Sequence, residues 1–155
     1  MKKTYKGKFT PKNKEKYIGN YNDIVYRSLW ERNAMRWCDE NRDVKKWSSE
    51  TIIIPYYCTT DKKKHRYFID LFIEFSNGEK YCIEIKPKKQ TLPPKRKTLI
   101  ESATYAKNTA KWNAAHTWCL DRGLKFAIWT EETLEKLGIK TFTKKFKPLK
   151  RLKKK

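Results

Sequence analysis

The sequence lacks the residue patterns that bind zinc or cross a membrane. Its four cysteines form no Cys-x-x-Cys pair, and neither of its two histidines lies near a cysteine cluster in the sequence. A zinc site is therefore not expected, and reduced thiols in a cytosolic protein explain the cysteines most simply. No apolar run approaches the roughly 20 residues that span a bilayer, so we expect no membrane-bound state.

Acidic residues are scarce at both ends of the chain. Residues 1–16 carry seven lysines against one glutamate, and residues 140–155 carry nine basic residues and no acid. The formal net charge is +21, and most of that excess lies in these two segments. Basic arms on a folded body indicate a polyanionic partner, usually nucleic acid, although a charge excess kept for solubility would look similar.

The length of 155 residues suits one domain, and no internal repeat is evident. We divide the chain into a basic N-terminal arm (1–22), a folded domain (23–139) and a basic C-terminal tail (140–155). Three meandering strands, a crossover helix and a fourth strand predict an α/β fold with a mixed four-stranded sheet flanked by helices. The expected helices cover about 28–41, 98–122 and 131–137, and the expected strands cover 51–58, 66–75, 80–86 and 124–130.

Alternation along the second and third strands brings two acids and a lysine together. Asp70 shares one face of its strand with Phe68 and Phe72, while Glu84 and Lys86 share one face of the next strand. Two carboxylates and a lysine from neighbouring strands make a site for a divalent metal and a water, and carboxylate oxygens suit Mg²⁺. The metal would acidify a bound water and neutralise charge on a phosphodiester.

The turn between these strands decides whether that site forms. A two-residue turn at Asn77-Gly78 would pair Asp70 with Ile85 and send the two carboxylates to opposite faces. A three-residue loop, 76–78, would pair Asp70 with Glu84, and such loops often end in a left-handed glycine. The metal-site hypothesis therefore predicts the three-residue loop.

Asp70, followed after 13 residues by Glu84-Ile85-Lys86, resembles the D…(D/E)xK signature of the PD-(D/E)XK nucleases, with Ile69 in place of the nominal proline. The resemblance covers about residues 4–130 and extends to the endonuclease subunit of heteromeric transposases. Further motifs are similar to the head-completion nucleases of large tailed phages: Tyr26-Arg27-Ser28-Leu29-Trp30-Glu31, Lys46-Trp47-Ser48-Ser49-Glu50, His65-Arg66-Tyr67-Phe68-Ile69-Asp70 and Ile85-Lys86-Pro87.

The resemblance implies a restriction-endonuclease-like αβββαβ core and a metal-dependent endonuclease that leaves 5′-phosphate and 3′-hydroxyl ends. Asp70, Glu84 and the backbone carbonyl of Ile85 would hold Mg²⁺, for which Mn²⁺ would substitute. Glu31 would join the metal site, and Lys86 would orient or deprotonate the attacking water. A capping box explains Glu31 without chemistry, and an ordinary salt-bridged strand face would explain the other acids and the lysine.

Basic and polar residues after the third strand are expected to contact DNA, with a solvated loop as the alternative. The long helix adds three further candidates. The tryptophans are expected in the core, and both histidines in structural or exposed positions. The predicted DNA-contacting residues are Lys88, Lys89, Gln90, Lys95, Arg96, Lys97, Lys107, Asn108 and Lys111.

Together these features predict a Mg²⁺-dependent DNA endonuclease, and the resemblance implies that it processes packaged DNA ends during phage head completion. The implied setting is the cytoplasm of an infected bacterium or the virion. The expected partners are DNA and the head portal or neck proteins, and the expected state is a monomer or homodimer. Alternatives are a non-catalytic basic protein that plugs the head, a transposase-like endonuclease subunit, and an RNA-binding protein, which would leave the two acids and the lysine unexplained.

Overall fold

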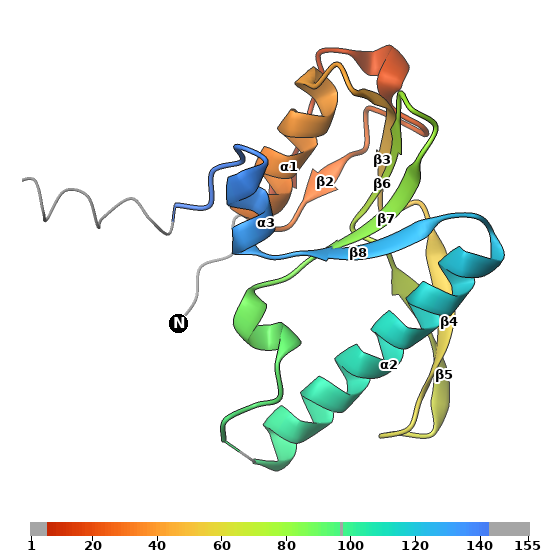
Figure 1. The fold of residues 1–155 in the computed structure, drawn as a ribbon, viewed down its shortest axis with the longest axis vertical. Coiled ribbons are helices and arrows are strands. Elements are labelled where there is room, and N and C mark those ends of the chain that lie inside the picture. The colour runs from red at the N-terminus through yellow and green to blue at the C-terminus, as the bar shows by residue number, and fades with distance from the viewer. Residues whose placement is uncertain (1–5, 97, 143–155) are drawn as a thin grey trace, which may run out of the picture.

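A computed structural model describes residues 6–96 and 98–142, and its central element is a four-stranded mixed sheet (Figure 1). β7 pairs antiparallel with β6 and parallel with β8, which follows the crossover helix. The predicted α/β fold with a mixed four-stranded sheet flanked by helices is confirmed. In spatial order the strands are β3 (Val44–Ser49), β6 (Leu71–Phe75), β7 (Lys80–Ile85) and β8 (Lys125–Trp129).

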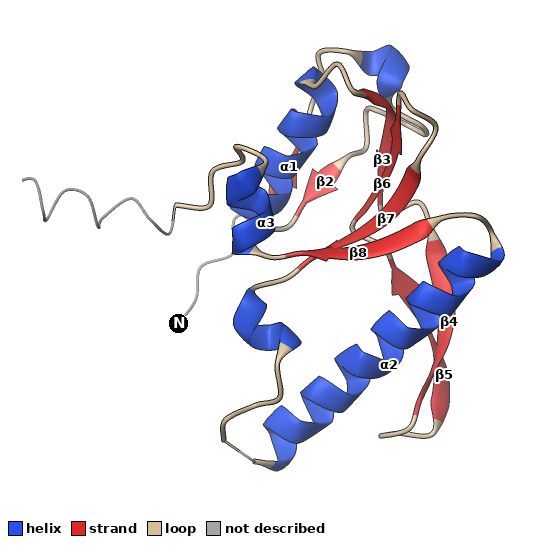
Figure 2. Cartoon of the chain, in the orientation of Figure 1, coloured by secondary structure: helices blue, strands red, loops and turns tan. Residues whose placement is uncertain are grey.

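Within the described residues, three helices accompany the sheet (Figure 2), and the first two begin after residues whose side chains cap them. Ser28 caps α1 by accepting a hydrogen bond from the Glu31 N–H at 3.1 Å, and Thr98 caps α2 in the same way. The helices are α1 (Leu29–Glu40), α2 (Leu99–Asp121) and α3 (Glu131–Lys136). The short elements are β1 (Gly7–Lys8), β2 (Val25–Tyr26) and the 3₁₀ turns η1 (Lys14–Lys16) and η2 (Lys88–Thr91).

The sheet differs from the prediction in one member, because β3 was not expected and the predicted first strand lies elsewhere. β3 pairs with β6, and a bulge between Val44 and Lys46 shifts its register. That bulge disrupts the alternation of apolar and polar residues by which a strand is recognised in a sequence. The segment predicted as the first strand forms β4 (Ile53–Cys58), which pairs with β5 (Lys63–Phe68) in a separate two-stranded hairpin.

The predicted second strand, 66–75, is divided into β5 and β6 by a bend at Ile69 and Asp70. Ile69 packs in the same cluster as residues of α2, whereas Leu71 and Ile73 pack in the cluster that contains residues of α1. Continuous alternation along one strand would place Ile69, Leu71 and Ile73 on the same face, so the prediction of a single strand over 66–75 is wrong. The bend turns the chain from the sheet into the β4–β5 hairpin and places Asp70 at the junction.

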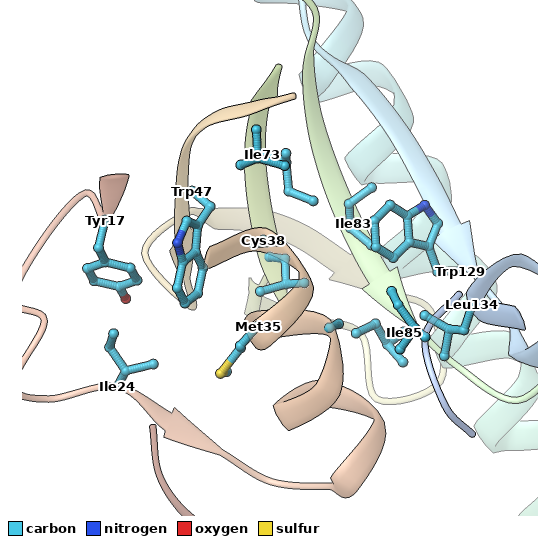
Figure 3. Close-up of a cluster of buried hydrophobic side chains, with 14 residues drawn as sticks. Tyr17, Ile24, Met35, Cys38, Trp47, Ile73, Ile83, Ile85, Trp129 and Leu134 are labelled. Carbon is cyan, nitrogen blue, oxygen red and sulfur yellow. The ribbon is translucent and has the colours of Figure 1, made fainter. Parts of the chain in front are cut away.

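Two hydrophobic clusters support the fold. The first joins α1 and α3 to the sheet around Trp47, which is fully buried (Figure 3). The second joins α2 to the β4–β5 hairpin and to Cys82 of β7. The N-terminal half of α2 is less covered than its C-terminal half, and Leu99 at its first position is 88% exposed. Burial along α2 begins only at Asn108.

The described part of the N-terminal arm, residues 6–22, lies against the folded domain. Buried Asp39 at the end of α1 accepts backbone hydrogen bonds from Lys12 at 2.8 Å and Asn13 at 3.0 Å. The Tyr17 ring packs edge-on against Trp47, with 4.7 Å between the ring centres. This segment therefore contributes to the core of the domain.

Only residues 140–142 of the C-terminal tail are described, and they too contact the domain. The indole N–H of Trp30 donates to the carbonyl of Thr141 at 3.0 Å, and the Asn33 side chain donates to the carbonyl of Lys140. Within residues 6–96 and 98–142, no helix combines the length and the apolar character needed to cross a membrane.

The turn between β6 and β7 is the three-residue loop that the metal-site hypothesis requires. Leu71 pairs with Ile83, and the Phe75 N–H donates to the Glu79 carbonyl at 2.8 Å, so Ser76 to Gly78 form the loop. Gly78 has φ +92°, in the left-handed region. The prediction is confirmed, and continuation of this register brings Asp70 level with Glu84.

Gly78→Ala should lower the free energy of unfolding by about 1 kcal/mol, because a side chain disfavours the positive φ that this loop requires. No atom lies within 4 Å of the position that the new Cβ would take, so the cost is conformational and not a clash. Urea unfolding measures the change. Gly78→Asn is the matched control and should lose less, because asparagine tolerates this region better. Equal losses would contradict the conformational explanation.

Candidate active site

Asp70 and Glu84 are held in place by hydrogen bonds from neighbouring strands. Asp70 Oδ2 accepts the backbone N–H of Ile85 at 2.8 Å. Glu84 lies near the end of β7 with its side chain only 7% exposed, and its Oε1 accepts the hydroxyl of Tyr67 at 2.5 Å. Each carboxylate thus has one oxygen engaged by a donor of fixed position, which restricts its orientation.

Lys86 completes the arrangement that the sequence predicted. Its Nζ lies 3.2 Å from Oε2 of Glu84, and its side chain is 23% exposed. The Lys86 N–H donates to the Trp129 carbonyl of β8 at 3.0 Å, so the backbone at this position remains tied to the sheet. The lysine therefore lies at the border between the buried carboxylates and solvent.

Glu31 approaches the same site from the first turn of α1. Its Oε1 accepts the backbone N–H of Arg27 at 2.8 Å while its own N–H donates to Ser28, so it has the capping role that the sequence allowed. Burial raises the pKa of Glu31, and the charges of Glu50 and Glu84 raise it further. Glu31 thus helps to cap α1 and also lies beside the other carboxylates of the site.

The acids of the site repel one another. Burial raises the pKa of Asp70 well above its usual value, and the charges of Glu84 and Glu31 add to the effect. The hydrogen bond from Ile85 and the charge of Lys86 act in the opposite direction without cancelling it. A cluster of partly buried oxygen ligands with unbalanced negative charge is the environment that a divalent cation stabilises.

Sequence reasoning missed Glu50, Arg27 and Tyr67. Glu50 has φ +57°, its N–H donates to the Asp70 carbonyl at 3.3 Å, and its carboxylate forms a two-point contact with Arg27 at 2.8 and 3.1 Å. Glu50 ends the Lys46–Glu50 motif that resembles the phage nucleases, which was the available signal. Tyr67 belongs to a second such motif, His65 to Asp70, but no role in the site was predicted for it.

The cavity between η2, the following loop and the N-terminal half of α2 brings together many of the predicted DNA-contacting residues. Its volume is about 560 Å³. Lys88 lies apart from this group, because its Nζ pairs with Glu132 at 3.1 Å and its N–H donates to Glu131. Lys97 lies outside the described residues. Of the predicted residues, the cavity is lined by Lys89, Gln90, Lys95, Arg96 and Asn108.

Lys111 lies close to the carboxylate site and is not part of the cavity described above. Its Nζ lies 5.1 Å from the centre of the Tyr67 ring, over the face of the residue that donates to Glu84. Burial lowers the pKa of Lys111, the charge of Glu84 opposes this effect, and Lys86 and Lys107 lower the pKa further. Lys107, one turn earlier on α2, is exposed.

A second group of potential ligands lies at the tip of the β4–β5 hairpin. One ligand atom from each of Cys58, Asp61 and His65 falls within 4.8 Å of the others. His65 Nε2 contacts Asp61 Oδ2 at 2.7 Å, and Asp61 also accepts the Lys63 N–H at 3.0 Å. These bonds close the turn by themselves, which agrees with the structural role expected for His65.

Comparison with known proteins supports the resemblance of the sequence motifs. The family described as "TnsA-like endonuclease N terminal" matches residues 41–131, a range that includes Asp70, Glu84 and Lys86 but not Glu31. The chain is also 44% identical over 146 residues to the Head completion nuclease of Enterobacteria phage T4, which covers 88% of this chain and 97% of that protein. No solved structure gives a significant match.

Asp70→Asn should stabilise the metal-free protein at neutral pH. Because the pKa of Asp70 is higher in the folded protein than in the unfolded chain, its charged carboxylate opposes folding. The free energy of unfolding therefore falls as the pH rises through the folded-state pKa of Asp70. Asparagine keeps an acceptor for the Ile85 N–H but carries no charge. The gain in melting temperature should shrink as pH falls toward the ordinary aspartate pKa of about 3.9. Asp43→Asn, at an exposed position, is the control, and an equal gain there would contradict the repulsion argument.

Proposed function

Because the chain belongs to the family of TnsA-like endonucleases, we propose that it hydrolyses phosphodiester bonds of DNA with Asp70, Glu84 and Lys86. One observation carries the assignment of these residues: Glu84 contacts Lys86, while Asp70 accepts the N–H of the residue between them. An ordinary exposed strand face would not bury Glu84 beside Asp70, whose pKa the charge of Glu84 helps to raise. The range matched by the family includes these three side chains, and the local electrostatics support their assignment to the site.

The donor set fits Mg²⁺ as the cofactor, with Mn²⁺ able to replace it. Asp70 and Glu84 offer carboxylate oxygens and Ile85 a backbone carbonyl, which are the ligand types that Mg²⁺ prefers. Glu31 adds a further carboxylate whose pKa is raised beside them. When bound, such an ion acidifies water and neutralises charge on the scissile phosphate.

The protein's own residues supply positioning and positive charge. The Lys86 ammonium, at the border with solvent, can hold an attacking water beside the carboxylates and stabilise the negative charge that develops on the phosphate. Tyr67 keeps Glu84 oriented through its hydroxyl, and Lys111 adds a second cation above the Tyr67 ring. Hydrolysis at this site is expected to leave 5′-phosphate and 3′-hydroxyl ends.

We assign the activity to phage head completion, where it would process the ends of packaged DNA. The support is the alignment with a protein named Head completion nuclease over 97% of that protein's length. The TnsA-like family match by itself fits a transposase-like setting equally well, but it covers only residues 41–131. Portal or neck proteins are the proposed partners, and the infected bacterium or the virion is the proposed location. A monomer or a homodimer would serve this role.

Asp70→Ala and Lys86→Ala should each abolish cleavage of supercoiled plasmid in Mg²⁺ or Mn²⁺, because each removes a charge at the proposed reacting centre. EDTA should abolish cleavage by the unchanged protein. Agarose gels measure nicking, and gel shifts in EDTA should show that both variants still bind DNA. The exposed Lys80→Ala serves as the control and should cut normally. DNA that is bound but never cut by the unchanged protein, with either metal, would favour the non-catalytic, head-plugging alternative.

Glu31→Gln should separate the capping role of this residue from its role at the metal site. The amide oxygen of glutamine can still accept the Arg27 N–H, so stability should change by less than about 0.5 kcal/mol. Cleavage should fall at least tenfold, because the negative charge is lost.

Ser28→Ala is the matched variant for Glu31→Gln, because it removes the cap and keeps the charge. It should lower stability by about 1 kcal/mol and leave cleavage below its melting temperature intact. Full activity of Glu31→Gln would exclude Glu31 from the metal site.

A further inference from the structure

The outer face of the β4–β5 hairpin is an exposed row of apolar and basic side chains. Its three cross-strand pairs face away from the second hydrophobic cluster: Ile53 with Phe68, Pro55 with Arg66, and Tyr57 with Lys64. Tyr57 is 51% exposed and Phe68 42% exposed, although large aromatic side chains are usually covered. Among the described residues, none of these six side chains belongs to either hydrophobic cluster.

The charge of the hairpin is strongly of one sign. The exposed side chains of Lys62, Lys63, Lys64 and Arg66 form no ion pair within the described part of the chain. The single acid of the hairpin, Asp61, already pairs with His65 at 2.7 Å. The Arg66 guanidinium lies 5.4 Å from the centre of the Phe68 ring. Unpaired cations beside exposed aromatic rings complement a polyanion that also presents flat, stackable groups.

The hairpin is rigidly connected to the active site. On its inner face, Tyr67 donates to Glu84, and Ile54 and Tyr56 pack in the cluster that contains α2 residues. The Ile69 N–H donates to the Ile52 carbonyl at 3.0 Å, so pairing continues to the bend that carries Asp70. The outer row begins at Phe68, which precedes Asp70 by two residues in the chain.

The length of the row matches a short stretch of DNA. Phe68 and Lys64 are four residues apart on β5, which corresponds to roughly 13 Å along the strand. Successive nucleotides of one DNA strand rise by about 3.4 Å along the helix axis, so the row spans about four of them. A ribbon of this length would contact the phosphates next to the one being cleaved.

We propose that this outer face binds the DNA that flanks the scissile phosphate. Lys64 and Arg66 bind backbone phosphates, and Tyr57 and Phe68 pack against sugars or bases. This surface is distinct from the η2–α2 cavity lined by Lys89 and the other residues named above. The proposal rests on the proposed nuclease function, because it concerns another part of the same substrate.

The test measures DNA affinity of the full chain in EDTA, where nothing is cut, over a series of salt concentrations. The double variant Lys64→Ala, Arg66→Ala should weaken binding of a 30-base-pair duplex about tenfold and lower the salt slope by roughly two, one unit for each lost phosphate contact. Tyr57→Ala with Phe68→Ala should weaken binding while leaving the salt slope unchanged, because neither side chain is charged.

The control is Lys80→Ala with Lys136→Ala, which removes two exposed positive charges from β7 and α3 and should change affinity less than twofold. Equal weakening by both basic double variants, or an unchanged affinity for the hairpin variant, would overturn the proposal.

Cleavage in Mg²⁺ separates this proposal from the proposed function. If the hairpin variant raises KM and keeps kcat, the surface binds substrate without touching the reaction, as proposed. If the unchanged protein cuts no DNA although the hairpin variant loses affinity, the nuclease function fails while the binding surface stands. If the unchanged protein cuts and the hairpin variant has the same KM, the binding surface fails while the nuclease function stands.

Discussion

The hydrogen bond from the Ile85 amide to the Asp70 carboxylate is the contact on which the rest of the site depends. The Asp70 side chain accepts the Ile85 N–H of β7 at the point where the chain passes from the hairpin into the sheet. The bend between β5 and β6 is thereby tied to the end of β7, next to Glu84 and Lys86. An apolar residue in place of Asp70 would leave the buried amide of Ile85 without this acceptor.

The same contact has an electrostatic cost that the surrounding residues reduce only in part. Asp70, Glu84 and Glu31 lie near one another at a partly buried site, and the pKa of Asp70 and of Glu31 is raised. Lys86 and Lys111 stand at the border of this cluster, and Arg27 holds Glu50. The two hydrophobic clusters stabilise the fold and so offset the repulsion among these carboxylates.

Local signals in the sequence predicted the elements that local chemistry determines. Ser28 caps α1, and the loop ending at Gly78 has the length and the left-handed glycine that the Asp70–Glu84 pairing required. β3 was missed because a bulge interrupts its alternation, and the change of face at Ile69 was missed because alternation continues through the bend in the sequence. The proximity of Glu50 to Asp70 depends on a positive φ at a glutamate, which no residue pattern indicates. The exposure of Leu99 in the N-terminal half of α2 also could not be predicted. The burial of a helix residue depends on which other elements pack against it, and the pattern within the helix does not specify them.

The loop between β6 and β7 limits which insertions and deletions the protein can accept during evolution. The side chains of residues 76–78 can be replaced where the new residue fits the backbone conformation. The number of residues in the loop cannot change freely, because it decides which residues of β7 face each side of the sheet. Loss of one residue would turn Ile83 and Ile85 toward the surface that Glu84 now faces and carry the Glu84 carboxylate to the opposite side. The turn at the tip of the β4–β5 hairpin has the same kind of restriction, because a one-residue shift of β5 would turn Tyr67 away from the face on which it donates to Glu84. Length changes among descendants of this chain should therefore be rare in both turns.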